Sequence, residues 1–299
     1  MEDGEQTAYL LQIISQIRAD HPTLSCRAMY YKIQPENMGR DCFESLCKDH
    51  GFSIERKLNL FRTTDSSGVV RFDDLLKNAN LSNINEAWSS DITYFEVQER
   101  FYYITFILDC FSRRVLGYQV SARLTTEHTT LPALKAAIKT RKSTIPIQII
   151  FHSDGGGQYY DKEFLKYTAA YQMRNSMCEF AYENGKAERL NGIIKNNYLV
   201  HYKIKTYAEL QKGVDRAVSL YNNERPHKAL KYQTPIGYEK RGVILQQQTE
   251  PIMTGSLDAK PNLKGALSPI QIEQTEPPIL GISSAKVIEG LRETAVNVI

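Results

Sequence analysis

The sequence lacks the features that would place the protein outside the cell or across a membrane. Its five cysteines are odd in number and scattered, with no CxxC pair and no His/Cys zinc spacing. We therefore expect neither a disulfide framework nor a structural zinc site. No apolar run approaches the length of a membrane span, and the N-terminal MEDGEQTAYLLQ has no signal pattern. These absences predict a cytoplasmic protein that does not contact a membrane.

A strong net charge is also absent. The formal charge of +3 over 299 residues is too small to indicate nucleic-acid binding. The segment from Lys186 to Arg241 differs, because it holds twelve Lys and Arg against five Asp and Glu. Such a segment suits a polyanionic substrate. A solvated helical face would give the same count, and the composition alone does not separate the two interpretations.

The middle of the chain alternates between β-type and helix-type patterns. Strands are predicted at 92–95, 103–108, 115–120, 147–151 and 175–178, and helices at 126–142, 162–171, 183–198 and 207–221. Three successive strands joined by short turns predict an antiparallel meander. The alternation of helices and strands that follows predicts an α/β fold, with a mixed sheet flanked by helices on both faces.

The segments on either side of this unit have other patterns. Residues 1–60 predict three short helices, which suit a small all-α, helix-turn-helix-like DNA-binding domain or a helical cap on the core. In the first case Arg27 and Arg40 would contact phosphates. Residues 61–85 predict a connector with one short helix at 72–79, and the core covers 86–243. Residues 244–299, which include the run QQQ and a helical pattern at 284–296, predict a flexible tail.

Three acidic residues are distinguished by their settings. Asp91 lies in WSSDITYF at the start of the first predicted strand, Asp154 follows the strand IIFHS, and Glu188 lies early in a helix. Strand ends and a helix can bring distant carboxylates to one point, where oxygen ligands favour Mg²⁺ or Mn²⁺. Two such ions promote in-line attack on a phosphodiester. The sequence thus predicts a metal-dependent enzyme acting on nucleic acid, with these three residues as catalytic and metal-binding groups.

Glu188 has two rivals nearby, Glu179 and Glu183. We prefer Glu188 because it lies well inside the predicted helix, where Asn191 and Lys195 share its face. Lys195 would then direct a cation at a substrate phosphate on the rim of the site.

Other polar residues near the strand ends have simpler interpretations. Asp109 heads a turn and is interpreted as structural. His152 is either a metal ligand, a general acid or base, or a hydrogen-bonded structural residue, and we favour the last. His227 stays undecided. The glycines at 155–157 are expected to permit close backbone approach and unusual dihedral angles next to Asp154.

Five segments occur in a fixed order: WSSDITYF, LDCFSRRVLGYQV, FHSDGGGQY, YENGKAERLNGIIKN and YNNERPHKALKYQTPIGY. Through them residues 88–238, about half of the chain, resemble the integrase-type catalytic core of DDE transposases from bacterial insertion sequences. The resemblance is greatest to the downstream-frame (OrfB-like) protein of elements with two overlapping reading frames. The N-terminal helices resemble the helix-turn-helix segment that precedes this core in the family.

The resemblance implies a ribonuclease-H-like fold, two Mg²⁺ ions, and an acidic triad of Asp91, Asp154 and Glu188. It also implies DNA cleavage and strand transfer during movement of the element, by a homo-oligomer on element ends and target DNA at the nucleoid. Whether the chain acts alone or as a frameshift fusion with an upstream frame stays open. The expected DNA contacts are Lys186, Arg189, Lys195, Arg225, Lys228, Arg27 and Arg40.

The chain departs from the family pattern in two places. The interval between Asp154 and Glu188 is slightly shorter than in the family, and the residues after about 243 lie outside the resemblance. The His/Cys zinc domain of retroviral integrases is absent. Two alternatives remain: a catalytically inactive DNA-binding regulator, which the intact triad disfavours, and a ribonuclease-H-like nuclease without strand transfer.

Overall fold

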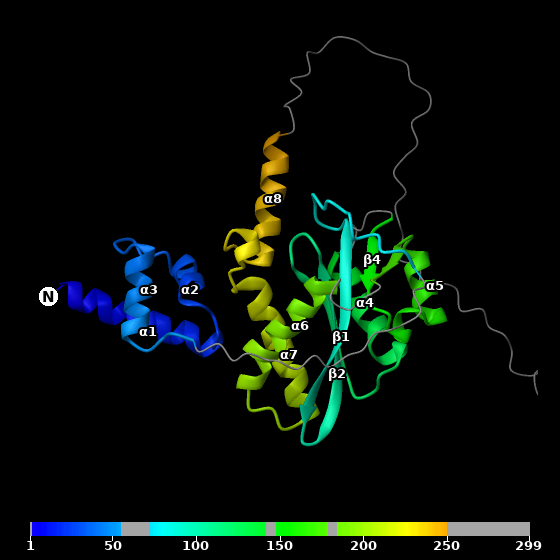
Figure 1. Cartoon of the computed structure of the whole chain (residues 1–299), viewed down its shortest axis with the longest axis horizontal. Helices are drawn as coiled ribbons and strands as arrows, with labels where there is room; N and C mark the ends of the chain where they lie inside the picture. The colour runs from blue at the N-terminus through cyan, green and yellow to red at the C-terminus, as the bar shows by residue number, and fades with distance from the viewer. Residues whose placement is uncertain (1, 55–71, 142–147, 179–183, 250–299) are drawn as a thin grey trace, which may run out of the picture. The chain divides into compact units, whose positions relative to one another are not determined.

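A computed structural model describes residues 2–54, 72–141, 148–178 and 184–249 (Figure 1). The helices are α1 Glu2–Asp20, α2 Cys26–Ile33, α3 Arg40–Asp49, α4 Thr130–Arg141, α5 Lys162–Ala170, α6 Gly185–Asn197, α7 Tyr207–Asn223 and α8 Pro235–Thr249. The strands are β1 Ala87–Val97, β2 Arg100–Asp109, β3 Val115–Ser121, β4 Ile150–Ser153 and β5 Arg174–Met177. None of the helices in these ranges is long and apolar enough to cross a bilayer.

The three N-terminal helices form as predicted. Ser25 caps α2 because its hydroxyl accepts a hydrogen bond from the Ala28 backbone N–H. Gly51 follows the end of α3 with φ +73°, a conformation that glycine adopts without strain. Buried side chains from all three helices, among them Ile14, Met29 and Phe43, form a separate hydrophobic cluster. The helix-turn-helix role of this segment stays a prediction.

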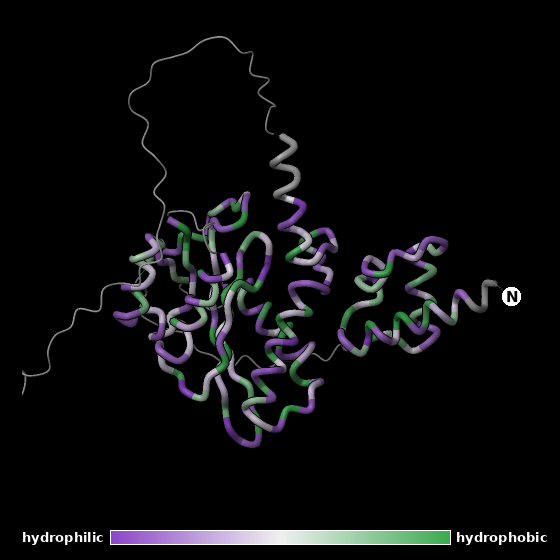
Figure 2. Tube along the Cα trace, turned by 180° about the vertical axis from the view of Figure 1, so that it is seen from behind, coloured by the Kyte–Doolittle hydropathy of each residue, from purple (hydrophilic) through white to green (hydrophobic). Residues whose placement is uncertain are grey.

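The five strands form one mixed sheet in the order β3-β2-β1-β4-β5. β1, β2 and β3 are antiparallel neighbours, which confirms the predicted meander. β4 lies parallel to β1, and β5 lies parallel to β4. Parallel neighbours require crossover connections, and α4 and α5 supply them. In Figure 2 the strands in the centre of this unit are largely hydrophobic, and the turn between β1 and β2 is hydrophilic.

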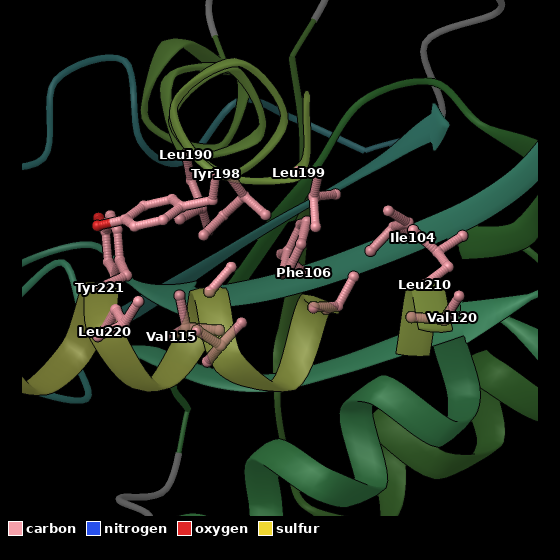
Figure 3. Packing of buried hydrophobic residues seen from close by; sticks show 14 of the residues in the cluster. Ile104, Phe106, Val115, Val120, Leu190, Tyr198, Leu199, Leu210, Leu220 and Tyr221 are labelled. Carbon is pink, nitrogen blue, oxygen red and sulfur yellow. The ribbon is translucent and has the colours of Figure 1, made fainter. Parts of the chain in front are cut away.

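Helices cover both faces of the sheet. On one face, α6 and α7 direct side chains such as Leu190 and Leu210 onto Ile104 and Phe106 of β2, and Leu199, from the turn between the two helices, joins them (Figure 3). On the other face, α4 and α5 enclose a second cluster that includes Trp88, Leu134, Phe151 and Phe164. The close approach of α4 to β3 requires glycine at position 117, because a Cβ there would lie 2.2 Å from the Ala133 carbonyl oxygen.

Several predicted boundaries were wrong. β1 begins at Ala87 rather than at residue 92, so Asp91 lies inside the strand and not at its start. The helix predicted at 72–79 does not form. Asp74 Oδ1 accepts hydrogen bonds from the backbone N–H groups of Leu76 and Lys77, and this Asx-type turn replaces it. α8 runs on to Thr249 and contains the QQQ run, past the expected start of the tail. The helix predicted at 284–296 lies outside the described residues.

A guanidinium–carboxylate cluster joins β2, the turn before β3, α4 and α8, and it is formed by Asp109, Arg114, Arg141 and Glu239. Arg141 donates to Glu239 Oε2 at 2.9 Å, and Arg114 donates to the same oxygen at 2.7 Å. Arg141 also lies 3.5 Å from Asp109 Oδ2. Asp109 is fully buried and accepts backbone hydrogen bonds from Asn85 and from the turn that follows it. The structural interpretation of Asp109 is confirmed.

Candidate active site

The register between β1 and β4 brings two of the three predicted carboxylates together. The last paired residues of this short parallel ladder are Ser89 and His152. Asp91 and Asp154 each lie two residues farther along their own strand direction. Because side chains alternate between faces with a period of two, both Asp side chains share a face with Ser89 and His152. Two carboxylates that are distant in sequence thus meet at the edge where β1 and β4 separate.

Asp91 is mostly buried, and its carboxylate is held by two donors. Oδ1 accepts a hydrogen bond from the Ile92 backbone N–H at 2.8 Å, and Oδ2 accepts one from Asn191 Nδ2 at 2.7 Å. Burial and the negative charge of Asp154 raise the pKa of Asp91 to about 8, and Glu188 adds to the rise. A carboxyl group with this pKa is poorly stabilised as an anion unless a cation joins it.

Asp154 follows β4 directly, and burial raises its pKa as well. Its Oδ1 accepts a hydrogen bond from the Gly156 backbone N–H at 3.2 Å. A Cβ at position 156 would lie 3.1 Å from the same oxygen, so the expected close backbone approach is present there. The expected unusual dihedral angles are not, because Gly51 is the only glycine with positive φ in the described part of the chain.

Glu188 occupies the first turn of α6, and its side chain is exposed. Its charge contributes to the raised pKa of Asp91, so it lies within electrostatic range of the Asp pair. Even so, no three His, Cys, Asp or Glu side chains among the described residues form a ready metal-binding cluster. The structure therefore brings Asp91 and Asp154 together and leaves Glu188 at the margin. The rivals Glu179 and Glu183 lie outside the described residues.

Asn184, directly before α6, fixes this helix to β1. Its Nδ2 donates to the Ser90 carbonyl oxygen at 2.9 Å, and its Oδ1 accepts from the Ser89 hydroxyl. Glu188 follows one turn later, and Asn191 one turn after that. The two hydrogen bonds set the position of α6 along the strand that carries Asp91.

His152 is buried, and its Nδ1 lies 2.9 Å from the Ser176 hydroxyl of β5 and 3.8 Å from Asp74 Oδ1. These contacts agree with the favoured interpretation of a hydrogen-bonded structural residue. A cavity of about 390 Å³ lies beside it and is lined also by Ser89 and Lys186. His227 is only partly exposed, and burial lowers its pKa to about 3, so it is neutral at physiological pH.

Most of the predicted DNA-contact residues line one groove. The groove has a volume of about 1070 Å³, and its basic lining residues are Arg27, Arg113, Lys186, Arg189, Arg225 and Lys228. Arg113 was not among the predicted contacts, and its only signal in the sequence is its place in the run SRR within the β2–β3 turn. Arg27 is also engaged with Glu44 at 2.7 Å. The groove concentrates positive charge along α6 and the segment after α7, next to Glu188.

Two predicted contact residues lie outside this groove. The ammonium group of Lys195 lies 4.7 Å from the centre of the Tyr94 ring. Burial lowers the pKa of Lys195, and the nearby charge of Asp91 opposes that shift, so this lysine lies close to the acidic pair. Arg40, on α3, pairs with its neighbour Asp41 at 2.8 Å. Lys195 thus lies within electrostatic range of Asp91, and its contact with a substrate phosphate stays a prediction.

Comparison with known proteins gives consistent matches. The integrase core domain family matches residues 82–182, and a second integrase core domain family matches residues 172–235, together about half of the chain. The transposase for insertion sequence element IS629 of Shigella sonnei is 30% identical over 183 residues, which make up 60% of each chain. A putative transposase for IS986/IS6110 of Mycobacterium tuberculosis is 28% identical, covering 75% of this chain and 83% of the relative.

Among solved structures, the HTLV-2 integrase catalytic core domain in complex with magnesium covers 52% of this chain and 97% of its own, with 22% identity and a TM-score of 0.43.

The strand order, the helices on both faces and the matched families define an integrase-type catalytic domain with a ribonuclease-H-like fold. The chain belongs to the family of bacterial insertion-sequence transposases that carry this integrase core.

Proposed function

We propose that this transposase cleaves DNA at the ends of its element and joins them to target DNA, with Asp91, Asp154 and Glu188 holding two Mg²⁺ ions. The observation that carries the proposal is that Asp91 on β1 and Asp154, directly after the parallel strand β4, lie close enough for the charge of Asp154 to raise the pKa of Asp91. Within the described ranges neither carboxylate forms an ion pair with a Lys, Arg or His. Two partly buried acids that form no ion pair are a donor set that suits a hard divalent ion.

Each residue of the site has a distinct part in the proposal. Asp91 and Asp154 provide fixed oxygen ligands, because each accepts a hydrogen bond from a nearby backbone N–H, that of Ile92 within β1 and that of Gly156 after β4. Glu188 completes the ligand set from the first turn of α6. When bound, the two ions activate water or a DNA 3′-hydroxyl as nucleophile and stabilise the charge on the departing oxygen. Lys195, near Asp91, positions a phosphate on the rim.

The groove supports a DNA partner. Lys186 and Arg189 flank Glu188 in sequence and line the groove together with Arg225 and Lys228. Positive charges arranged in this way attract the phosphate backbone without reading base sequence. We further propose that the protein acts in the cytoplasm, at the nucleoid, as a homo-oligomer on element ends and target DNA. A fusion to an upstream frame would add a second DNA-binding segment.

The test of the chemistry uses labelled element ends, a target duplex and Mg²⁺. Asp154→Ala is expected to reduce cleavage and joining by more than about 10³-fold, or about 4 kcal/mol of transition-state stabilisation. End binding in a gel-shift assay should stay within about twofold, because no phosphate contact is removed. Asp215→Ala, at an exposed position on α7, is the matched control and should retain full activity.

The products separate the alternatives. Wild-type protein that binds ends without cleaving them would indicate an inactive regulator. Cleaved ends with no joined product would indicate a nuclease without strand transfer. Mg²⁺-dependent cleavage retained by Asp154→Ala would refute the residue assignment itself.

The groove is tested by the salt dependence of DNA binding. Lys228→Ala should lower the slope of log affinity against log salt by about one, as expected for one lost phosphate contact. Lys139→Ala is the matched control, since Lys139 is exposed on α4, on the other face of the sheet. An equal slope for both variants would place the DNA elsewhere.

A further inference from the structure

We propose that Asn191 is a positioning residue of the metal site, which orients the Asp91 carboxylate with its amide N–H and presents its amide oxygen to the ligand sphere of a divalent ion. This inference rests on the proposed function and assigns a role beyond the acidic triad. Asn191 lies on α6, one turn after Glu188, and is 6% exposed. Its Nδ2 donates to Asp91 Oδ2 at 2.7 Å.

The other half of this amide has no protein partner. Asn191 Oδ1 is buried and accepts no hydrogen bond from any described residue. An ionised Asp91, the form that binds a cation, can only accept, so the amide directs Nδ2 toward it, and Oδ1 is the group left over. A buried amide oxygen without a donor is unfavourable, because its desolvation is not compensated by a hydrogen bond within the protein.

Two other buried asparagines show what a purely structural amide looks like here. Asn184 uses both ends of its amide, with Ser89 and with the Ser90 carbonyl oxygen. Asn222 also uses both ends, accepting from the Val115 backbone N–H and donating to the Val115 carbonyl oxygen, each at 2.9 Å. Asn191 alone of the three has an open acceptor, and it is the one bonded to Asp91. The open oxygen therefore belongs to an amide that directly contacts a carboxylate of the candidate metal site.

The chemistry of the missing partner follows from the surroundings. Oδ1 shares a carbon with Nδ2, so it lies within one amide width of the hydrogen bond to Asp91. Carboxylates accept hydrogen bonds and do not supply donors when ionised. A divalent ion held by Asp91 and Asp154 would satisfy Oδ1, because hard cations accept amide oxygens as ligands and their bound waters donate strongly. A leucine at this position would fill a similar volume without that capacity.

The test measures metal affinity in the full chain without DNA, by titrating Mn²⁺ and following the free ion by electron paramagnetic resonance. Asn191→Leu should weaken Mn²⁺ binding by about 10–100-fold, the usual loss when a group supporting a metal ligand is removed. Asn191→Asp, which keeps an oxygen, should recover most of that affinity. Asn196→Leu, at an exposed position on the same helix, should bind Mn²⁺ like the wild type.

A merely structural role gives a different pattern. Asn191→Leu would then lower the melting temperature of the metal-free protein and leave the Mn²⁺ affinity unchanged, which would overturn the inference. Asn191→Ala gives the same readouts if the leucine variant does not fold. Asp154→Ala separates the two proposals. Loss of Mn²⁺ binding in Asp154→Ala but not in Asn191→Leu defeats only the role of Asn191, whereas unchanged binding in Asp154→Ala defeats the proposed metal site.

Discussion

The domain contains two groups of carboxylates, one buried and one partly buried, that differ in the residues around them. In the guanidinium–carboxylate cluster, Glu239 is 8% exposed and meets Arg141 and Arg114. Burial pushes the pKa of Glu239 up, but the hydrogen bonds and charge of Arg141 outweigh burial, and the pKa is lowered. Asp91 and Asp154 have no such partners in the described residues, and both pKa values are raised. Carboxylates thus join secondary-structure elements through arginine in the first group, whereas in the second group they repel each other and suit a divalent cation.

The two groups should therefore respond to pH in opposite directions. The lowered pKa of Glu239 contributes stability above its unfolded value of 4.5, and that stability is lost as the pH falls through the folded value. The raised pKa of Asp91 contributes stability below its unfolded value of 3.8, and that stability is lost as the pH rises toward about 8. Without metal, the two groups therefore favour the folded state at different pH: Glu239 loses its contribution in acid, and Asp91 loses its contribution as the pH rises toward about 8.

The largest expected effect on stability comes from removing the central arginine of the guanidinium–carboxylate cluster. Arg141→Met leaves Glu239 and the buried Asp109 without their shared guanidinium, and it should lower the free energy of unfolding by about 3–5 kcal/mol. Urea unfolding measures the loss. Lys139→Met, two residues earlier on the exposed side of α4, is the control and should change stability by less than about 0.5 kcal/mol. A similar small change for Arg141→Met would show that the cluster contributes little.

The second prediction is a gain in stability, caused by removing the charge of Asp91. Asp91→Asn removes a charge that has no cation partner, so in EDTA at pH 8 it should raise the free energy of unfolding by at least about 1.4 kcal/mol, the equivalent of one pKa unit. For a domain of this size each kcal/mol raises the melting temperature by about 2–4 °C. At pH 5 the gain should shrink, because the wild-type carboxyl group is then protonated. With Mg²⁺ present the wild type should become the more stable protein. A gain of equal size at both pH values would contradict the raised pKa.

The smallest expected effect comes from filling the space beside the Asp154 carboxylate. Gly156→Ala places a Cβ 3.1 Å from Asp154 Oδ1, so the carboxylate must shift by a few tenths of an ångström. Mn²⁺ affinity should fall by less than about tenfold, and stability should change by about 1 kcal/mol or less. Gly157→Ala is the matched control, because a Cβ there meets no atom within 4 Å. Equal Mn²⁺ affinities for the two variants would mean that the Asp154 carboxylate adapts freely.

Local sequence patterns predicted the elements that carry the site. β-branched and aromatic runs located β1, β2 and β3, and the apolar run before Asp154 located β4. The boundaries were less accurate where polar residues lie in a buried strand, as Ser89 and Ser90 do in β1. The helix predicted at 72–79 was wrong because the backbone hydrogen bonds of Asp74 favour a turn. Glutamine is a good helix former, so the QQQ run extends α8 instead of ending it.

The site itself depends on contacts that no local pattern contains. The meeting of Asp91 with Asp154 follows from the pairing of Ser89 with His152, which is a property of the sheet. The role of Arg141 depends on α8 packing near α4, about a hundred residues later in the chain. The open acceptor of Asn191 is visible only once every neighbouring donor has been placed. The sequence pattern thus identified the two aspartates. Their difference from Asp109 depends on the fold, which places Arg141 beside Asp109.

The short ladder between β1 and β4 makes the position of the Asp91 carboxylate depend on the number of residues between Ser89 and Asp91. Loss of one residue between Ser89 and Asp91 would turn the first carboxylate to the opposite side of the sheet, because strand side chains alternate. Phe95 and Val97 would turn with it, away from the cluster formed with α6 and α7, whereas the residues that line the groove lie outside β1. A copy of the element with such a deletion would then encode a protein that keeps its groove residues but has lost the pair of neighbouring carboxylates.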